Sequence, residues 1–154
     1  MKWSIRVISA AEIDFCFATL QLIIGYKHFK DGVSVLKQVT GQTHQDIEQD
    51  IVSIIVGKVL PKFVLAIHAL MGFCYLAQLQ ELNNNSLSSL STLLQLFHKH
   101  KQTILDISGC VGKRDKVMTH FQIPKLELMH GVVPSVVESG AVIQWSADRC
   151  QNPF

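Results

Sequence analysis

Apolar side chains recur along the chain at intervals of three and four residues, the spacing that places them on one face of an α-helix. No segment competes with this pattern through the strict alternation and tight turns that predict β-hairpins. We therefore predict an all-α protein, a compact bundle of about five to six helices. A chain of 154 residues is long enough for one hydrophobic core, so residues 1–154 are predicted to form a single helical domain.

In the first half of the chain, the pattern predicts a largely buried helix over residues 12–27 and a turn at residues 29–32. We expect a short helix over residues 33–39, ended by Gly41, and then a longer helix with Thr43 as its N-cap. The apolar stripe of that longer helix consists of Ile47, Ile51, Ile54 and Ile55.

A fourth helix is predicted to begin at Pro61, because a proline in the first turn loses no hydrogen bond, and to run to about Leu82. Apolar residues surround most of this helix, so we expect it at the centre of the fold. His68 is interpreted as a hydrogen-bonded core histidine. The residues predicted to share the buried face are Val64, Ile67, His68, Met71, Cys74 and Tyr75.

A fifth helix is predicted to follow a cap at Asn85 or Ser86. Pro124 then opens a sixth helix, which Pro134 should kink or end early. Residues 149–154 are predicted to form an unstructured tail. The stripe of the fifth helix consists of Leu87, Leu90, Leu93, Leu94, Phe97, Lys101 and Ile104.

Composition narrows the class of protein. With 48% hydrophobic residues and 17% charged residues, the chain is not of the disordered class, and a net charge of +2 gives little support for a broad nucleic-acid surface. The four cysteines form no CxxC pair, which favours a reduced protein inside the cell, nuclear or cytoplasmic. The N-terminal apolar stretch is too short to span a membrane and lacks a small-residue cleavage site, so we expect neither membrane insertion nor secretion.

The side chains that carry chemistry predict no catalytic site. His98 and His100 stand two positions apart on a helix, so they point about 200° apart and do not share a metal. We predict no metal site and no cofactor. Asp46 and Asp50 lie one turn apart, but their polar neighbours suggest a solvated face. If the chain were an enzyme, a magnesium-dependent nuclease or strand transferase would use Asp46, Asp50 and Asp148.

Basic residues gather weakly near the end of the fifth helix and in the loop that follows it. They predict at most a weak contact with DNA, and a solubilising surface is the simpler interpretation. These residues are Lys99, Lys101, Lys113, Arg114 and Lys116.

Seven segments resemble, in order and spacing, the C-terminal helical region of the Kyakuja–Dileera–Zisupton and Plavaka-type transposases of fungi. Together they cover residues 29–148. The segments are FKDGVS (29–34), KQVTG (37–41), HQDI (44–47), FCYLAQ (73–78), FHKHK (97–101), FQIPKLE (121–127) and IQWSAD (143–148).

This resemblance implies a mobile-element enzyme that cuts and joins DNA with a metal-bound acidic triad on an RNase H-like core. In the family, the segment equivalent to IQWSAD continues into a glutamate and, three positions later, a histidine. Gln151 and Phe154 stand at those places here, and an amide carries no charge to hold magnesium. The resemblance therefore implies a transposase remnant that keeps Asp148 but has lost the catalytic glutamate.

From the residues and the resemblance together, we predict a transposase-derived helical domain that is inactive alone. It would act as an interaction module, with a helical protein or a second copy of itself as partner and only weak DNA binding. The first alternative is the metal-dependent nuclease or transposase fragment. The second is a helical protein recruited to secretion or ligand binding. Loss of a catalytic-core partner would leave an exposed apolar face.

Overall fold

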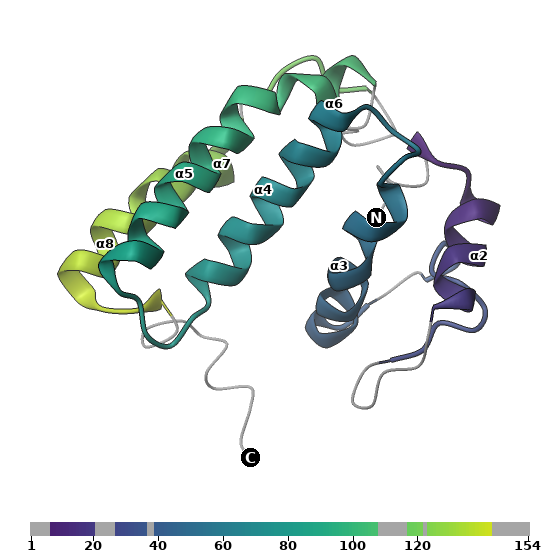
Figure 1. The fold of residues 1–154 in the computed structure, drawn as a ribbon, viewed down its shortest axis with the longest axis horizontal. Coiled ribbons are helices and arrows are strands. Elements are labelled where there is room, and N and C mark those ends of the chain that lie inside the picture. Colours follow the sequence, from purple (N-terminus) through teal and green to yellow (C-terminus); the bar gives the residue numbers. More distant parts are fainter. Residues whose placement is uncertain (1–6, 21–26, 37–38, 108–116, 122, 143–154) are drawn as a thin grey trace. The chain divides into compact units, whose positions relative to one another are not determined.

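The computed structural model describes residues 7–20, 27–36, 39–107, 117–121 and 123–142 (Figure 1). These residues are mainly helical and include no β-strand, which confirms the predicted all-α class. The predicted tail, residues 149–154, lies outside the described residues, as do Cys110 and Cys150.

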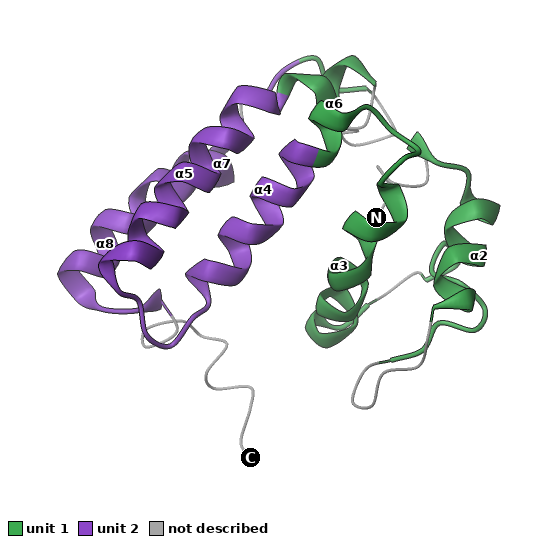
Figure 2. Ribbon diagram, viewed as in Figure 1, with its two compact units in different colours: residues 1–64, 102–119 green, residues 65–101, 120–154 purple. Residues whose placement is uncertain are grey.

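The contacts divide the chain into two compact units, each made of two segments (Figure 2). Unit 1 contains residues 1–64 and 102–119, with α2 (Ala10–Thr19), α3 (Gly41–Ile55) and α6 (Gln102–Asp106). Unit 2 contains residues 65–101 and 120–154. Helix α4 (Pro61–Ala77) contributes its first turn to unit 1 and its remainder to unit 2. A single domain stays a prediction.

Helix α2 is shorter than the predicted helix over residues 12–27 and begins earlier. Ser9 is its N-cap, accepting a hydrogen bond from the Glu12 N–H at 3.3 Å, and residues 21–26 lie outside the described chain. The buried side chains of α2 are those of Ile13 and Phe17. The sequence pattern missed this start because Ser9 precedes two alanines, which carry little periodic signal.

The carboxylate of Asp14 holds the loop after α2 against the helix. Its Oδ1 accepts the N–H groups of Val33 and Ser34, each at 2.8 Å, and its Oδ2 accepts the Ser34 hydroxyl. Burial acts to raise the pKa of Asp14, but these hydrogen bonds outweigh it and lower the pKa. The rings of Phe17 and Phe29 also pack edge to face between the helix and the loop, with their centroids 5.7 Å apart.

The predicted turn at residues 29–32 is confirmed. The Gly32 N–H donates to the Phe29 carbonyl at 2.9 Å, and Gly32 has a φ of +78°. A side chain is strained at such a φ, and a Cβ at this position would also overlap the Asp14 carboxylate. The close approach of the loop to α2 therefore depends on glycine.

The N-cap of helix α3 lies three residues before the predicted one. Thr40, not Thr43, is the N-cap: its Oγ1 accepts the Thr43 N–H at 3.2 Å and lies 3.0 Å from the Thr43 Oγ1. Gly41 therefore opens this helix and does not close an earlier one, because the hydroxyl at residue 40 satisfies the first-turn N–H. The predicted stripe is confirmed, since Ile47, Ile51, Ile54 and Ile55 are all buried.

Helix α4 begins at Pro61 as predicted but ends at Ala77, before the predicted Leu82. Its buried face also differs from the predicted one: Ile67 is buried, but His68 and Tyr75 are exposed. The helix is apolar on nearly every side, so its periodicity could not show which side faces the core. The buried residues of α4 are Phe63, Ala66, Ile67, Ala69, Phe73 and Ala77.

Helix α5 (Asn84–His100) has Asn83 as its N-cap, two or three residues before the predicted cap. The Asn83 Oδ1 accepts the Ser86 N–H at 2.9 Å and the Ser86 hydroxyl at 3.1 Å. The predicted stripe supplies the buried residues Leu90, Leu94 and Phe97.

The predicted sixth helix is interrupted. It consists of α7 (Pro124–Leu128), the 3₁₀ turn η2 (Met129–Gly131) and α8 (Val132–Ser139). The break precedes Pro134, which lacks an N–H and crowds the carbonyl of residue 130, four positions earlier. A continuous α-helix is therefore not available through residues 129–131.

The core of unit 2 joins α4, α5 and α8. Phe73 and Ala77 of α4 pack with Leu90 and Leu94 of α5. Met129, Val132 and Val133 pack against this core from η2 and α8. Gly72 lets α4 approach α5 closely, since a Cβ there would lie 3.2 Å from the Leu93 Cδ1.

We predict that Gly32→Ala destabilises the protein by about 2 kcal/mol, because the substitution combines a strained φ with overlap of the Asp14 carboxylate. Gly41→Ala is the matched control, since open space surrounds it and alanine favours the helix. Urea unfolding followed by circular dichroism measures both. Equal stability of the two variants would contradict the role given to Gly32.

Candidate functional site

The acidic pair of the sequence lies on α3, and it is less solvated than expected. Asp46 is 5% exposed and accepts a hydrogen bond from Gln42 Nε2 at 3.1 Å, while Thr43 is 8% exposed. The expectation of a solvated face is therefore wrong for these two residues. Asp50 is half-buried. Sequence periodicity did not predict the burial of Asp46 and Thr43, because both residues are polar and lie among other polar residues.

Burial and the negative charge of Asp46 raise the pKa of Asp50 above its ordinary value of 3.8. Two carboxylates at this spacing repel each other unless a cation lies between them. Among the described residues, no group of three or more histidine, cysteine, aspartate or glutamate side chains could hold a metal ion. Asp148, the third acid of the nuclease alternative, lies outside the described residues.

Of the five basic residues predicted to contact DNA, two lie among the described residues. Lys99 is exposed on α5. Lys101 is half-buried, its Nζ lies 2.9 Å from His98 Nδ1, and it sits 5.7 Å from the centroid of the Phe121 ring. Lys113, Arg114 and Lys116 lie outside the described residues.

A stacked pair of histidines joins α5 to η2 in unit 2. The rings of His98 and His130 are nearly parallel, at 11°, with centroids 4.8 Å apart. Sequence reasoning considered His98 with His100, which diverge on the helix, and had no signal for a partner 32 positions away. The pair is thus a product of the tertiary fold.

The surroundings of His98 favour the neutral ring. The Lys101 ammonium donates to Nδ1, which therefore carries a lone pair and leaves the proton on Nε2. Nε2 is buried and has no hydrogen-bond partner among the described residues. Burial, followed by the positive charges of Lys101 and His130, lowers the pKa of His98 below its ordinary 6.5.

The described residues line a pocket in each unit. In unit 2 a pocket of about 320 Å³ lies between α5 and the η2–α8 segment, with Gln95, Met129 and His130 among its lining residues. In unit 1 a pocket of about 450 Å³ has a mainly aliphatic lining. Neither pocket gathers several charged groups that would predict catalysis.

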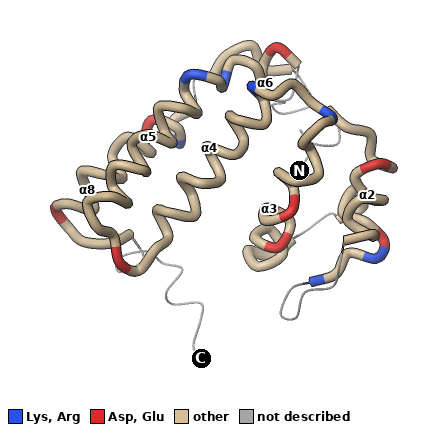
Figure 3. Tube along the Cα trace, viewed as in Figure 1, with Lys and Arg blue, Asp and Glu red and all other residues tan. Residues whose placement is uncertain are grey.

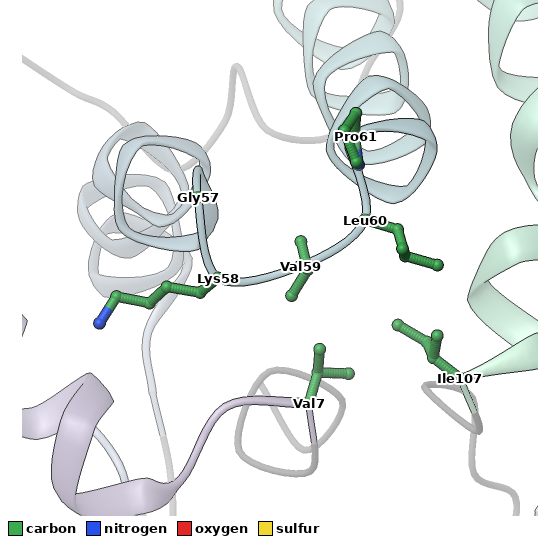
Figure 4. A pocket seen from close by; sticks show the side chains of 7 residues that line it. All are labelled: Val7, Gly57, Lys58, Val59, Leu60, Pro61 and Ile107. Atoms are coloured by element: carbon green, nitrogen blue, oxygen red, sulfur yellow. The ribbon is translucent and has the colours of Figure 1, made fainter.

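Figure 4 shows the unit 1 pocket, where Val7, Leu60 and Ile107 direct their side chains toward a shared space. Lys58 extends away from it, and its ammonium pairs with the Glu12 carboxylate of α2. The pocket therefore offers an apolar wall without a charge directed into it.

Helix α4 and the residues that follow it expose large apolar side chains. Leu65 is 42% exposed, Tyr75 is 38% exposed, and Leu79, just after the helix, is 42% exposed. His68 is also exposed, so its predicted place in the core is wrong. Figure 3 shows α4 without charged residues beyond its first turn, where Lys62 lies. No helix in the described part of the chain is long and apolar enough to cross a membrane.

The other two long helices have polar outer surfaces. The exposed residues of α5 are Asn84, Asn85, Ser88, Ser89, Thr92, Gln95 and Lys99. Those of α3 are Gly41, Gln42, His44, Gln45, Gln49 and Ser53. Among the three longest helices, α4 is therefore the one that exposes large apolar side chains; Phe15 of α2, Leu128 of α7 and Val137 of α8 are exposed on shorter helices. We call Leu65, His68, Tyr75 and Leu79 the α4 face.

Comparison with protein-family models, with curated proteins and with solved structures finds no match to this chain.

We predict that stability falls as the pH drops below about 6.5, because His98 has a lower pKa in the folded state than in the unfolded chain. The stability that the neutral His98 ring contributes is fully present above the pKa of this histidine in the unfolded chain. It is lost as the pH falls from that pKa to the lower pKa of the folded state. The melting temperature at pH 5.5 should lie a few degrees below that at pH 7.5.

His98→Gln should reduce this difference, since glutamine does not titrate. His44→Gln, which changes an exposed histidine on α3, is the matched control and should preserve it. The assignment to His98 is rejected if both variants keep the full pH dependence in thermal melts.

We predict that Asp50→Asn raises the melting temperature at pH 7 by about 1–3 °C, because it removes a carboxylate charge that burial and Asp46 disfavour. The raised pKa means that the unfavourable contribution is present at neutral pH and disappears as Asp50 is protonated. The gain should therefore vanish below about pH 4. A lower melting temperature at pH 7 would show that the Asp50 charge stabilises the fold.

Proposed function

We propose that this chain is a helical interaction module without catalytic activity of its own, and that its binding surface is the α4 face. The observation that carries the proposal is the exposure of Leu65 on α4 and of Leu79 just after it, beside a helix that has no charged residue after Lys62. Another helix is the partner that suits a narrow apolar stripe along a helix.

Burial of the α4 face would provide a favourable free energy of association. Removal of apolar surface from water contributes roughly 25 cal/mol for each Å². Leu65 and Leu79 each keep 42% of their surface accessible in the monomer, and the half-buried Val64 and Met71 flank them. A partner helix would cover these side chains without any loss of hydration of a charged group.

Nucleic acid is a weaker candidate as partner. Lys99 is exposed at the end of α5, but the Lys101 ammonium is already bonded to His98. Binding to DNA depends on the number of phosphates that basic residues neutralise. The transposase origin stays a prediction, and the interaction proposal does not depend on it.

We predict that the dye ANS binds the α4 face at submicromolar protein concentration, and that Leu65→Lys with Leu79→Lys removes at least about half of its fluorescence. Val35→Lys with Val56→Lys is the matched control, because both valines are exposed elsewhere, in unit 1. Circular dichroism verifies that each variant stays folded.

Plasmid nicking in the presence of magnesium tests the absence of catalysis. We expect no cleavage above that of Asp46→Asn, which removes a carboxylate that the nuclease alternative requires. Magnesium-dependent cleavage that Asp46→Asn abolishes would overturn the proposed function. Dye fluorescence that the α4 variants leave unchanged would overturn the choice of surface.

A further inference from the structure

We propose that the stacked histidines His98 and His130 form a pH-sensitive switch, which holds residues 124–139 on α5 at neutral pH and releases them in mild acid. Release uncovers apolar side chains that this segment covers in unit 2. The inference goes beyond the proposed function and does not depend on the α4 face. The geometry of the histidine pair and the weak burial of the segment carry it.

Two imidazole rings lie face to face across the contact between α5 and η2. The His98 and His130 rings are 11° from parallel, and their centroids are 4.8 Å apart. Histidine is the side chain whose charge ordinarily changes between pH 5 and pH 8. Stacking of neutral rings is favourable, whereas two imidazolium rings at this separation repel each other. The contact therefore turns from attractive to repulsive when both rings are protonated.

A third positive charge lies beside the pair. Burial lowers the pKa of His98, and the positive charges of Lys101 and His130 lower it further. The segment before α7 faces this cluster with the uncharged ring of Phe121, over which the Lys101 ammonium lies, and its His120 is exposed. In the part of the chain that the structure describes, no aspartate or glutamate forms an ion pair with His98, Lys101 or His130. Protonation therefore gathers positive charge that no carboxylate balances.

The closed contact also lacks acceptors for a protonated His98. An imidazolium has two N–H donors. Nδ1 of His98 faces the Lys101 ammonium at 2.9 Å, and Nε2 is buried without a hydrogen-bond partner among the described residues. Separation of η2 from α5 would expose both nitrogens to water. Proton uptake and release of the segment are therefore coupled.

Residues 124–139 are held weakly enough for this coupling to act locally. Helix α7 and η2 contain no buried residue, and Val136 is the buried residue of α8. Met129, Val132 and Val133 are half-buried against the core of unit 2. Figure 1 shows α7 and α8 along α5. Elements with few buried side chains open at a lower free energy than the core, so this segment should separate before α4 and α5 unfold.

Release changes the surface that unit 2 presents. The core that Met129 and Val133 help to cover includes Leu90 and Leu94 of α5. The pocket of about 320 Å³ between α5 and the η2–α8 segment, which His130 also lines, would open at the same time. In mild acid the chain therefore gains an apolar surface that is covered at neutral pH.

Hydrogen–deuterium exchange of the full chain, measured by mass spectrometry at pH 7.5 and pH 5.5, tests the proposal. The rates are first corrected for the intrinsic pH dependence of exchange. Peptides within residues 124–139 should then lose protection at pH 5.5 by at least about threefold, since each proton taken up on opening changes the opening equilibrium by up to about tenfold per pH unit. Peptides from α3 and α4 should keep their protection.

Two variants assign the response to the histidine pair. His98→Gln keeps an acceptor for Lys101 but does not titrate, so it should remove most of the pH response. His130→Phe keeps a ring in the stack without a titrating charge and should reduce the response by a smaller factor. His44→Gln, which changes an exposed histidine on α3, is the matched control and should retain the full response. Thermal melts at pH 7.5 verify that each variant is folded, and either histidine variant alone is sufficient for the test.

Equal protection of residues 124–139 at the two pH values overturns the switch. Equal loss of protection in α3 and α4 overturns local release, because the whole protein then opens in acid. A full pH response in His98→Gln or in His130→Phe overturns the assignment to the pair. The variant Leu65→Lys with Leu79→Lys should retain the response, so failure of the α4 face as a binding surface leaves the switch in place.

Discussion

Helix α4 carries more apolar surface than one core can cover, and this constraint shapes the rest of unit 2. Phe73 and Ala77 face α5, and the core they form with Leu90 and Leu94 accounts for one side of the helix. Leu65 and Leu79 remain exposed because no other described element of unit 2 covers them. In a surface helix those positions are ordinarily polar, as they are on α5. The fold therefore leaves part of the apolar surface of α4 exposed.

Unit 1 is organised by a polar contact. Asp14 accepts the N–H groups of Val33 and Ser34 and so satisfies backbone donors that the loop itself cannot pair. The contact also requires a residue without a side chain at position 32, where φ is +78°. The Phe17–Phe29 pair then adds apolar packing beside the carboxylate. A short loop thus becomes a fixed part of the unit.

The sequence predicted the features that depend on a local contrast between apolar and polar residues. The α3 stripe was found because its isoleucines alternate with glutamines and acids, so that only one phase of the helix is apolar. Periodicity did not identify the buried face of α4, because apolar residues lie on nearly every side of this helix. His68 was therefore predicted to be buried, whereas it is exposed. Caps were displaced by two or three residues, because Thr40 and Thr43, or Asn83 and Asn85, are equally good N-cap residues.

For the candidate site, the sequence identified charged residues but not their partners. Asp46 and Asp50 were paired correctly by helical spacing, whereas the burial of Asp46 depends on the tertiary fold. His130 had no sequence signal that would connect it to His98. Lys101 shows the consequence most clearly. Its ammonium already donates to His98 Nδ1 and lies over the Phe121 ring, so a phosphate would have to displace both contacts to bind it. A count of basic residues therefore overstates the charge that this end of α5 offers to DNA, and the argument for a protein partner at α4 is correspondingly stronger.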